Sequence, residues 1–285
     1  MAEVKVNDTA KSSQMTVQQR INHIVRWLKS YAKSAKINTL VVGISGGIDS
    51  SVVSTLCAQT GLKTIVVQMP IRQNRKLDNR SSMQASWLLE RHSNITHMAM
   101  DLSPVFTAFE KKVGAFCSTE QEPNSQEQLA WANSRSRLRM MTLYQIAQSH
   151  GALVVGTGNR VEDFGVGFFT KYGDGGVDIG PIGDCDKTAV WDMGRELGLP
   201  QEIIDAEPTD GLWDDSRTDE DQLGMTYPEL EHVMQLDQWD REESHLTEGL
   251  LQMSRQERAH LKRYREIRAR NMHKMLPIPV CKFDK

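Results

Sequence analysis

Residues 39–51 read Thr39-Leu-Val-Val-Gly43-Ile44-Ser45-Gly46-Gly47-Ile48-Asp49-Ser50-Ser51, and this stretch decides the fold. Its apolar start, bounded by a glycine, is typical of a parallel β-strand that is covered on both faces. The glycines that follow allow a tight turn into a helix, which we expect to begin near Ile48. Backbone N–H groups in such a turn face the positive end of the helix, so the stretch predicts an anion-binding loop at the end of a buried strand.

Strands and helices alternate on both sides of this loop. Thr16 is expected to cap an amphipathic helix that precedes the first strand. The later elements are expected as helices over residues 48–59, 77–92, 103–116 and 126–149, and as strands over residues 63–69, 95–100 and 152–156. This alternation predicts an α/β fold: an open parallel sheet flanked by helices, with three layers, α/β/α.

Composition and charge narrow the class of protein. The 285 residues are 39% hydrophobic and 25% charged with a net charge of −3, as in ordinary soluble globular proteins. No apolar run approaches the ~20 residues that span a bilayer, and the polar N-terminus is no secretory signal, so we expect no membrane association. The near-neutral charge does not favour nucleic acid as a partner. Four well-separated cysteines without a CxxC pair are typical of the reducing cytoplasm.

The chain is expected to have one main domain. Residues 1–15 are polar and aperiodic and predict a flexible tail, which leaves residues 16–285 as a single domain with a helical C-terminal region. Charge is segregated in that region: residues 201–243 hold 15 acidic and two basic residues, and residues 255–274 hold eight basic and two acidic ones. Two interpretations stay open. In the first, both segments are simply exposed to solvent, as loops and as one face of a helix. In the second, the basic helix reaches the phosphates of a ligand while the acidic loops lie near a metal ion.

The anion-binding loop contains Asp49, which would repel an anion unless a cation is bound there. Mg²⁺ bridging Asp49 and phosphate oxygens would remove this conflict. The loop lacks the GxxxxGK[ST] pattern of a Walker A loop. It resembles the SGGxDS loop of the ATP pyrophosphatases, which bind ATP and cleave between its α- and β-phosphates. This resemblance implies an adenine nucleotide alpha hydrolase-like fold, with ATP as co-substrate and Mg²⁺ as cofactor.

A second glycine-rich stretch follows the strand expected at residues 152–156. It runs from Gly156-Thr157-Gly-Asn159 through Glu162-Asp163 to GFFTKYGDGG at residues 167–176. The run GFFTKYGDGG resembles the signature of the NAD synthetases. Further matches to this family, spread over roughly residues 40–280, are Asn133, Arg137, Arg139-Met140, Pro181-Ile182 with Lys187, Glu207-Pro208-Thr209, Leu223-Gly224 with Tyr227, and His273-Lys274.

The chain departs from the family pattern in two places. The family often has LPxGxQ after the second strand, whereas this chain has Met69-Pro-Ile-Arg-Gln73. Many members have GTDHAAEA where this chain has GTGNRVED, and the segment before GFFTKY is one residue longer here. The phosphate loop and Glu162 still match the family.

The resemblance implies a ligase that forms a C–N bond, the ammonia-dependent type of NAD synthetase. Deamido-NAD would react with ATP to give NAD-adenylate and pyrophosphate, and ammonia would then displace AMP to give NAD. The rival readings are another ATP pyrophosphatase, such as a GMP synthetase-like subunit, and an ATP-binding regulator that has lost its chemistry. We expect free ammonia rather than glutamine to be used, since too few residues precede the first strand for an amidase domain.

The resemblance also implies a role for each matched residue. Asp49 and Glu162 would hold Mg²⁺. The catalytic residues would be Lys187, which binds the departing phosphates, and Asp174, the base that accepts a proton from ammonium. The residues expected to bind ATP are Gly43, Ile44, Ser45, Gly46, Gly47, Ile48, Asp49, Ser50, Thr157, Lys187 and Thr209. Those expected to bind deamido-NAD are Arg137, Lys171, Asp178, His273 and Lys274. A homodimer built on the helix at residues 126–149 is implied, with substrate sites at its interface.

Overall fold

The structure is a computed structural model that describes residues 15–72, 75–117, 124–209, 218–242 and 253–283. The tail predicted at residues 1–15 lies outside the described residues except for Met15. Within the described part, no helix is long and apolar enough to cross a membrane.

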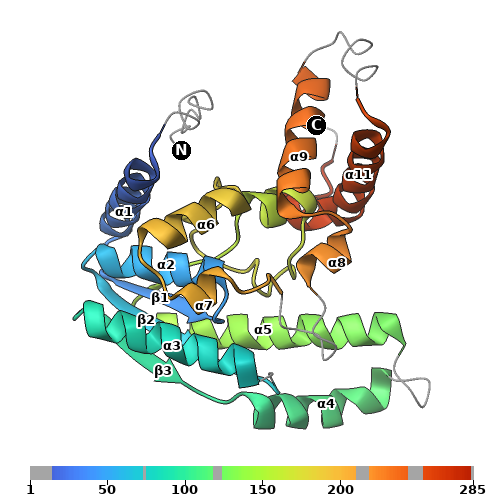
Figure 1. Cartoon of the computed structure of the whole chain (residues 1–285). Helices are drawn as coiled ribbons and strands as arrows, with labels where there is room; N and C mark the ends of the chain where they lie inside the picture. The colour runs from blue at the N-terminus through green and yellow to red at the C-terminus, as the bar shows by residue number, and fades with distance from the viewer. Residues whose placement is uncertain (1–14, 73–74, 118–123, 210–217, 243–252, 284–285) are drawn as a thin grey trace.

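A parallel sheet forms the middle of the molecule (Figure 1). Its order is β3-β2-β1-β4, and all three pairings are parallel. The strands are β1 (Thr39–Ile44), β2 (Lys63–Gln68), β3 (Ile95–Ala99) and β4 (Leu153–Val154). The predicted α/β class and open parallel sheet are therefore confirmed. The fourth strand is shorter than predicted, although Val155 still donates to the Val41 carbonyl at 2.8 Å and forms an isolated bridge with Ile179.

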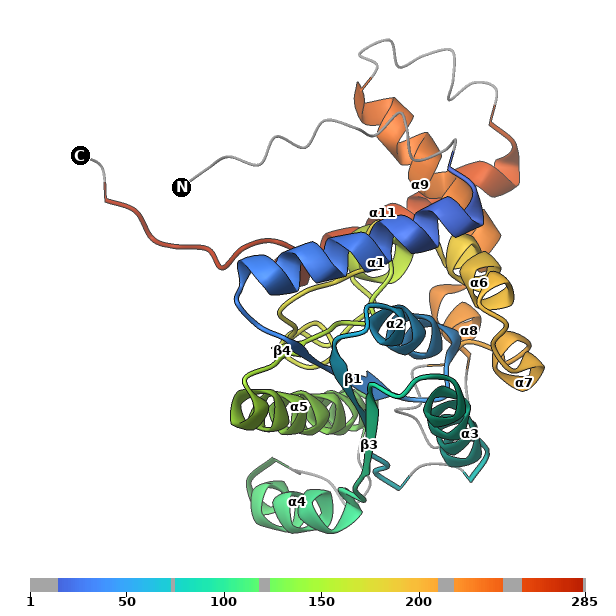
Figure 2. The same cartoon turned by 90° about the vertical axis from the view of Figure 1, so that its left-hand side faces the viewer.

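Helices cover both faces of this sheet (Figure 2). One face carries α2 and α3, with α1, α6 and α7 packed on the same side, and the other carries α4 and α5. The helix bounds are α1 (Val17–Ser34), α2 (Ile48–Gln59), α3 (Arg75–Arg91), α4 (Ser103–Cys117), α5 (Ser125–His150), α6 (Lys187–Glu196) and α7 (Gln201–Ile204). Thr16 caps α1 as predicted, since its side chain accepts the Gln19 N–H.

Alternation along β1 explains the three layers. Leu40 and Val42 pack with α2 in one buried cluster, whereas Val41 packs with α4 and α5 in another. Successive side chains of a strand point to opposite faces, so a fully apolar strand needs cover on both. All three of these side chains are fully buried.

A third apolar cluster lies in the C-terminal region and involves the π-helix η2 (Arg160–Val166). The helices that pack there are α8 (Asp219–Leu223), α9 (Tyr227–Glu242) and α11 (Arg255–Met275). Leu230 of α9 and Ile267 of α11 are among its buried members.

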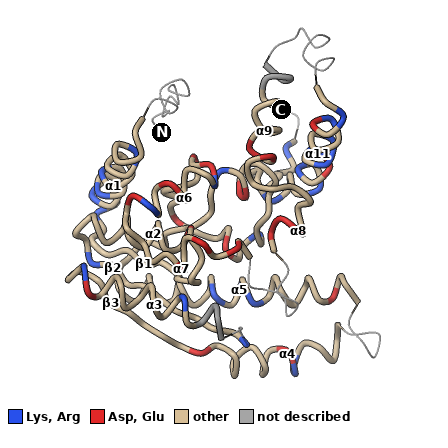
Figure 3. The backbone as a smooth tube through the Cα atoms, viewed as in Figure 1, with Lys and Arg blue, Asp and Glu red and all other residues tan. Residues whose placement is uncertain are grey.

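Lys and Arg residues are frequent along α1 and α11, and Asp and Glu residues mark parts of α6, α8 and α9 (Figure 3). Several α11 side chains bind backbone carbonyls of the segment at residues 164–169 rather than standing free in solvent. Asn271 donates to the Val166 carbonyl at 2.9 Å, and Lys274 donates to the Gly167 and Phe169 carbonyls at 3.0 and 2.9 Å. Arg268 donates to the Phe164 and Gly165 carbonyls. The helix thus holds the second glycine-rich stretch in place.

The two glycine-rich stretches meet where the sheet order reverses. β1 lies between β2 and β4, and the segments that leave β1 and β4 at their carboxyl ends run side by side. Ligands of open α/β sheets bind in the crevice at this switch point.

Candidate active site

The anion-binding loop has the predicted form. Gly46 adopts a left-handed backbone with φ +79°, which a side chain would strain, and Gly47 is the N-cap of α2. The Ser45 N–H donates to the Ser50 hydroxyl at 3.2 Å, and the Ser50 and Ser51 hydroxyls donate to the Gly47 carbonyl. Ser51 is fully buried and serves the loop itself.

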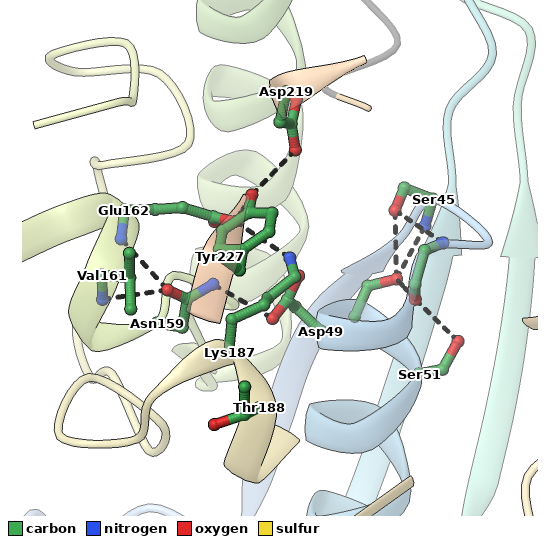
Figure 4. Close-up of polar contacts among 12 residues, drawn as sticks. Ser45, Asp49, Ser51, Asn159, Val161, Glu162, Lys187, Thr188, Asp219 and Tyr227 are labelled. Atoms are coloured by element: carbon green, nitrogen blue, oxygen red, sulfur yellow. Dashed lines mark hydrogen bonds and ion pairs between the residues drawn. The ribbon is translucent and has the colours of Figure 1, made fainter. Parts of the chain in front are cut away.

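The centre of the site is the Lys187 ammonium group (Figure 4). Lys187 is the first residue of α6, and its side chain is only 3% exposed. Its Nζ lies 2.5 Å from Asp49 Oδ2 and 2.9 Å from Glu162 Oε1. Three segments that are far apart in the sequence therefore meet at one buried cation.

Asn159 and Tyr227 hold the two carboxylates in position. The side-chain oxygen Oδ1 of Asn159 accepts the Val161 and Glu162 N–H groups, both at 3.0 Å, at the start of η2, while its side-chain Nδ2 donates to Asp49 Oδ1 at 3.2 Å. The Tyr227 hydroxyl donates to Glu162 Oε1 at 2.6 Å. Both side chains are buried, so the pair is fixed by groups that solvent does not reach.

The π-helical form of η2 fits its sequence. A π-helix forms i→i+5 hydrogen bonds and takes up more residues per turn than an α-helix, and it often occurs at functional sites. This segment is the one that is a residue longer than the family pattern. Glu162, which lies in this segment, contacts the Lys187 ammonium at 2.9 Å.

Burial and charge act against each other in this network. Burial alone would lower the pKa of Lys187, but Asp49 and Glu162 raise it, so the amine stays protonated. Burial raises the pKa of the Asp49 carboxyl, although Lys187 opposes the change. Burial would also raise the pKa of Glu162, but Lys187 and the Tyr227 hydroxyl hold it below its ordinary value. The attraction between Lys187 and the two acids thus offsets the cost of burying their charges.

Two more carboxylates, Asp163 and Asp174, line the same pocket. Burial, with repulsion from Glu162, Asp174 and Asp49, raises the pKa of Asp163 to about 8. Asp174 is reached by solvent through the pocket, yet the surrounding protein desolvates it and raises its pKa. Its Oδ1 accepts the Ser136 hydroxyl at 2.7 Å and the Thr170 N–H at 2.9 Å, so it also closes the loop of the GFFTKYGDGG run.

The structure gathers the residues predicted to bind ATP around this pocket. Its lining includes ten of the predicted residues: Gly43, Ile44, Ser45, Gly47, Ile48, Asp49, Ser50, Thr157, Lys187 and Thr209. Gly46 lies in the loop but does not line the pocket.

The residues predicted to bind deamido-NAD lie outside this lining. Arg137 donates to the Lys171 carbonyl at 3.2 Å, and Lys171 donates to the His273 carbonyl at 2.7 Å, so these three lie together with Lys274 beside the GFFTKYGDGG run. Asp178 makes none of these contacts; its carboxylate accepts hydrogen bonds from the Tyr144 hydroxyl, at 3.0 Å, and from the Val154 N–H.

The donor set around Lys187 suits Mg²⁺. Asp49 and Glu162 already converge on one positive charge. The described residues hold no group of three or more His, Cys, Asp or Glu side chains that could bind a metal. Mg²⁺ is commonly held by one or two carboxylates together with substrate phosphates and water, so two carboxylates beside an anion-binding loop fit this ion.

Three residues of this site, Asn159, Tyr227 and Asp163, had no role predicted from the sequence. The signals that could have indicated them were GTGN for Asn159, the LG-x-x-Y turn for Tyr227, and the acidic pair at residues 162–163. None of these patterns shows which side chain faces the pocket.

The family model described as NAD synthase matches residues 20–277. An NH(3)-dependent NAD(+) synthetase of Carboxydothermus hydrogenoformans is 38% identical over 218 residues, which are 76% of this chain and 85% of that protein. An NH(3)-dependent NAD(+) synthetase of Alkaliphilus metalliredigens is 34% identical over 247 residues, 86% of this chain and 97% of the relative.

Solved structures agree with the fold. A structure described as NMN synthetase from Francisella tularensis superposes with a TM-score of 0.78 at 29% identity, covering 95% of this chain and 100% of that one. An NH3-dependent NAD synthetase from Campylobacter jejuni superposes with a TM-score of 0.72 at 20% identity, covering 94% of this chain and 100% of its own; that likeness concerns the fold alone.

Proposed function

The chain belongs to the NAD synthase family, and from this we propose that it is an ammonia-dependent ligase that converts deamido-NAD to NAD at the expense of ATP. The observation that carries the proposal is the convergence of Lys187, Asp49 and Glu162 beside the anion-binding loop. A regulator without chemistry would have no need of a buried ammonium held between two carboxylates next to that loop.

The first step would activate a carboxylate, which is a poor electrophile. One oxygen of the nicotinate carboxylate attacks the α-phosphorus of ATP, the bond to the bridging oxygen breaks, and pyrophosphate leaves. The N–H groups at the start of α2 would bind the phosphates. Lys187 keeps its proton and its side chain can turn from Asp49 towards the leaving oxygens, where it would balance their charge.

In the second step ammonia attacks the carbonyl carbon of the adenylate and AMP leaves, which gives the amide. Ammonium must first lose a proton. We propose Asp174 as the group that accepts it, because its carboxylate is held by Ser136 and Thr170 at the edge of the pocket. The raised pKa of Asp174 is the direction that suits a base working near neutral pH.

Asp49 and Glu162 are proposed to hold Mg²⁺ when ATP is bound. The ion supplies a Lewis acid that polarises the phosphates and offsets their charge. Asn159 and Tyr227 would keep the two carboxylates aimed at the same point while the cation there changes.

We further propose a homodimer in the cytoplasm. The outer surface of α4 and α5 leaves large apolar side chains uncovered: Phe109 is 44%, Leu129 is 47% and Met141 is 59% exposed. Light scattering on the purified protein tests this point, with Leu129→Lys/Met141→Lys as the variant expected to be monomeric. A monomeric wild-type protein would contradict it.

The test of function is an assay of the purified protein with ATP, MgCl2, ammonium chloride and deamido-NAD. We expect one NAD, one AMP and one pyrophosphate per turnover, and no product when glutamine replaces ammonium. Xanthosine monophosphate serves as the control substrate, because it is the purine that a GMP synthetase-like enzyme would amidate. Turnover of that purine alone, or ATP binding without turnover of any nicotinate nucleotide, would contradict the proposal.

A second candidate is amidation of nicotinate mononucleotide. The Francisella tularensis structure, which is described as NMN synthetase, is the observation that favours it. The two substrates carry the same reacting carboxylate and differ in the adenylyl group, so the chemistry of the pocket does not separate them. The ratio of kcat/KM for deamido-NAD to that for nicotinate mononucleotide decides between them, and we expect it to exceed one.

A further inference from the structure

Arg80 faces the anion-binding loop from the neighbouring helix α3. It lines the same pocket as Ser45, Asp49 and Lys187. A Cβ added at Gly46 would lie 2.8 Å from Arg80 Cβ and 2.7 Å from the backbone nitrogen of Ser81, so the loop and this turn of α3 touch. Arg80 follows the stretch at residues 69–73 that departs from the family pattern, and none of the family motifs quoted above includes it.

This part of α3 is fastened to its surroundings. The side-chain amide of Gln68, at the end of β2, donates to the Ser81 and Ser82 hydroxyls at 2.8 and 3.0 Å. One turn further on, the amide of Gln84 donates to the Ser51 carbonyl of α2 at 3.3 Å. Arg80 therefore stands at a defined place beside the loop.

The guanidinium of Arg80 is not committed to a protein partner at its Nε. This atom is buried and has no hydrogen-bond partner among the described residues. A buried donor without a partner is costly, and such donors in native structures call for an explanation. A ligand anion that enters the pocket would supply the missing acceptor.

The charge of the pocket points to the same conclusion. The Lys187 ammonium is already paired with Asp49 and Glu162, and the neighbouring acids Asp163 and Asp174, whose pKa values burial raises, add no positive charge. A triphosphate brings about four further negative charges, more than Lys187 and one divalent ion would balance. The planar fork of arginine suits phosphate oxygens, which it binds through two parallel N–H groups.

We propose that Arg80 binds the phosphates of ATP, and then the pyrophosphate that leaves, closing the side of the anion-binding loop that faces α3. The inference rests on the proposed ATP site. It assigns a further substrate-binding residue to that site, on an element that the family motifs do not include.

The test compares Arg80→Gln and Arg80→Lys with Arg91→Gln. Arg91 is a matched control, since it lies on the same helix, at its exposed end, where it pairs with Glu90. The measurements are the KM for ATP, the KM for deamido-NAD and the inhibition constant of pyrophosphate against ATP. Loss of a charged hydrogen bond predicts that Arg80→Gln raises the ATP and pyrophosphate constants by roughly 10- to 100-fold.

The other outcomes separate binding from structure. We expect the KM for deamido-NAD to change less than about 3-fold, Arg80→Lys to lie between wild type and Arg80→Gln, and Arg91→Gln to match wild type. ATP and pyrophosphate constants within about 3-fold of wild type in Arg80→Gln would overturn the inference, as would a lowered thermal midpoint with those constants unchanged. If the wild-type protein amidates no nicotinate nucleotide, the proposed function fails. Calorimetric titration of ATP into wild type and Arg80→Gln then tests the role of Arg80 separately. Equal affinities for ATP would overturn the inference about Arg80.

Discussion

Replacing Lys187 with methionine removes the cation from the centre of the site while keeping the unbranched side chain up to the position of Cε. Its Nζ is the charge partner of Asp49 at 2.5 Å and of Glu162 at 2.9 Å, and the two carboxylates are only 17% and 16% exposed. Without Lys187 these two mostly buried carboxylates would face each other with no compensating charge. Removing one partner of a buried ion pair costs about 3–5 kcal/mol, mostly because the remaining charge has no compensation.

We therefore expect Lys187→Met to lower the free energy of unfolding by about 3–5 kcal/mol in urea titrations with EDTA present. Lys29→Met on the exposed surface of α1 is the control, and it should change stability by less than about 0.5 kcal/mol. The double variant Lys187→Met/Glu162→Gln should lose less than the two single variants together, because one of the unpaired carboxylates is then neutral.

Mg²⁺ provides a second readout of the same geometry. If Asp49 and Glu162 can hold the ion, adding MgCl2 should stabilise Lys187→Met more than wild type, because in the variant no ammonium competes for the two carboxylates. A variant as stable as Lys29→Met in EDTA would refute the reasoning, since the ammonium would then contribute nothing to the fold.

Three other experiments test separate parts of the structure. Asp49→Asn and Glu162→Gln should each lower turnover by about 10²-fold or more, with the fold intact by circular dichroism. Turnover is measured across a Mg²⁺ titration, and near-normal rates in both variants would remove the metal from the mechanism. Tyr227→Phe removes the hydroxyl that donates to Glu162 at 2.6 Å and should cost about 1–3 kcal/mol of stability in denaturant titrations, whereas an unchanged midpoint would show that this hydrogen bond does not matter. Iodoacetamide at pH 8 should modify Cys117 and Cys281, which are exposed. It should spare Cys57 and Cys185, because burial raises the pKa of their thiols to about 12 and about 11. Mass spectrometry of the treated native protein measures the modification, and similar rates at all four cysteines would contradict this.

The sheet could be predicted because its signals are local. Leu40, Val41 and Val42 form an apolar run ahead of a glycine turn, and such a run has few stable outcomes other than a strand buried on both faces. The Thr16 cap and the helices of the first half follow from patterns within about ten residues. The loop after β1 was predictable for the same reason, since Gly46 and Gly47 carry its geometry themselves.

The rest of the site depends on contacts between distant segments. Tyr227 reaches Glu162 across 65 positions in the chain, and Lys187 reaches Asp49 across 138. No periodicity encodes which face of α9 lies against η2. The basic residues of α11 illustrate the same limit: a solvated face and a phosphate-binding face were both open from the sequence, whereas Arg268 and Lys274 bind backbone carbonyls.

Gly158 shows how a family pattern and a structure can be read together. Many members have an aspartate at the position of Gly158 and an alanine at the position of Asp163. In this chain the aspartate is at the second position and the small residue at the first. A Cβ at Gly158 would overlap the Asp163 carboxylate, so the two positions share one space. The sequence alone showed only that the segment diverges, whereas the packing shows that the Asp163 carboxylate leaves no room for a side chain at Gly158.

The central claim is that the nicotinate carboxylate is activated by adenylation in this pocket. The most direct measurement is isotope transfer: deamido-NAD labelled with ¹⁸O in its carboxylate is incubated with the purified protein, ATP, MgCl2 and ammonium chloride, and the products are examined by mass spectrometry. The account predicts one ¹⁸O in the phosphate of AMP, one retained in the amide of NAD, and none in pyrophosphate. Unlabelled AMP, or label that appears in pyrophosphate or inorganic phosphate, would contradict it.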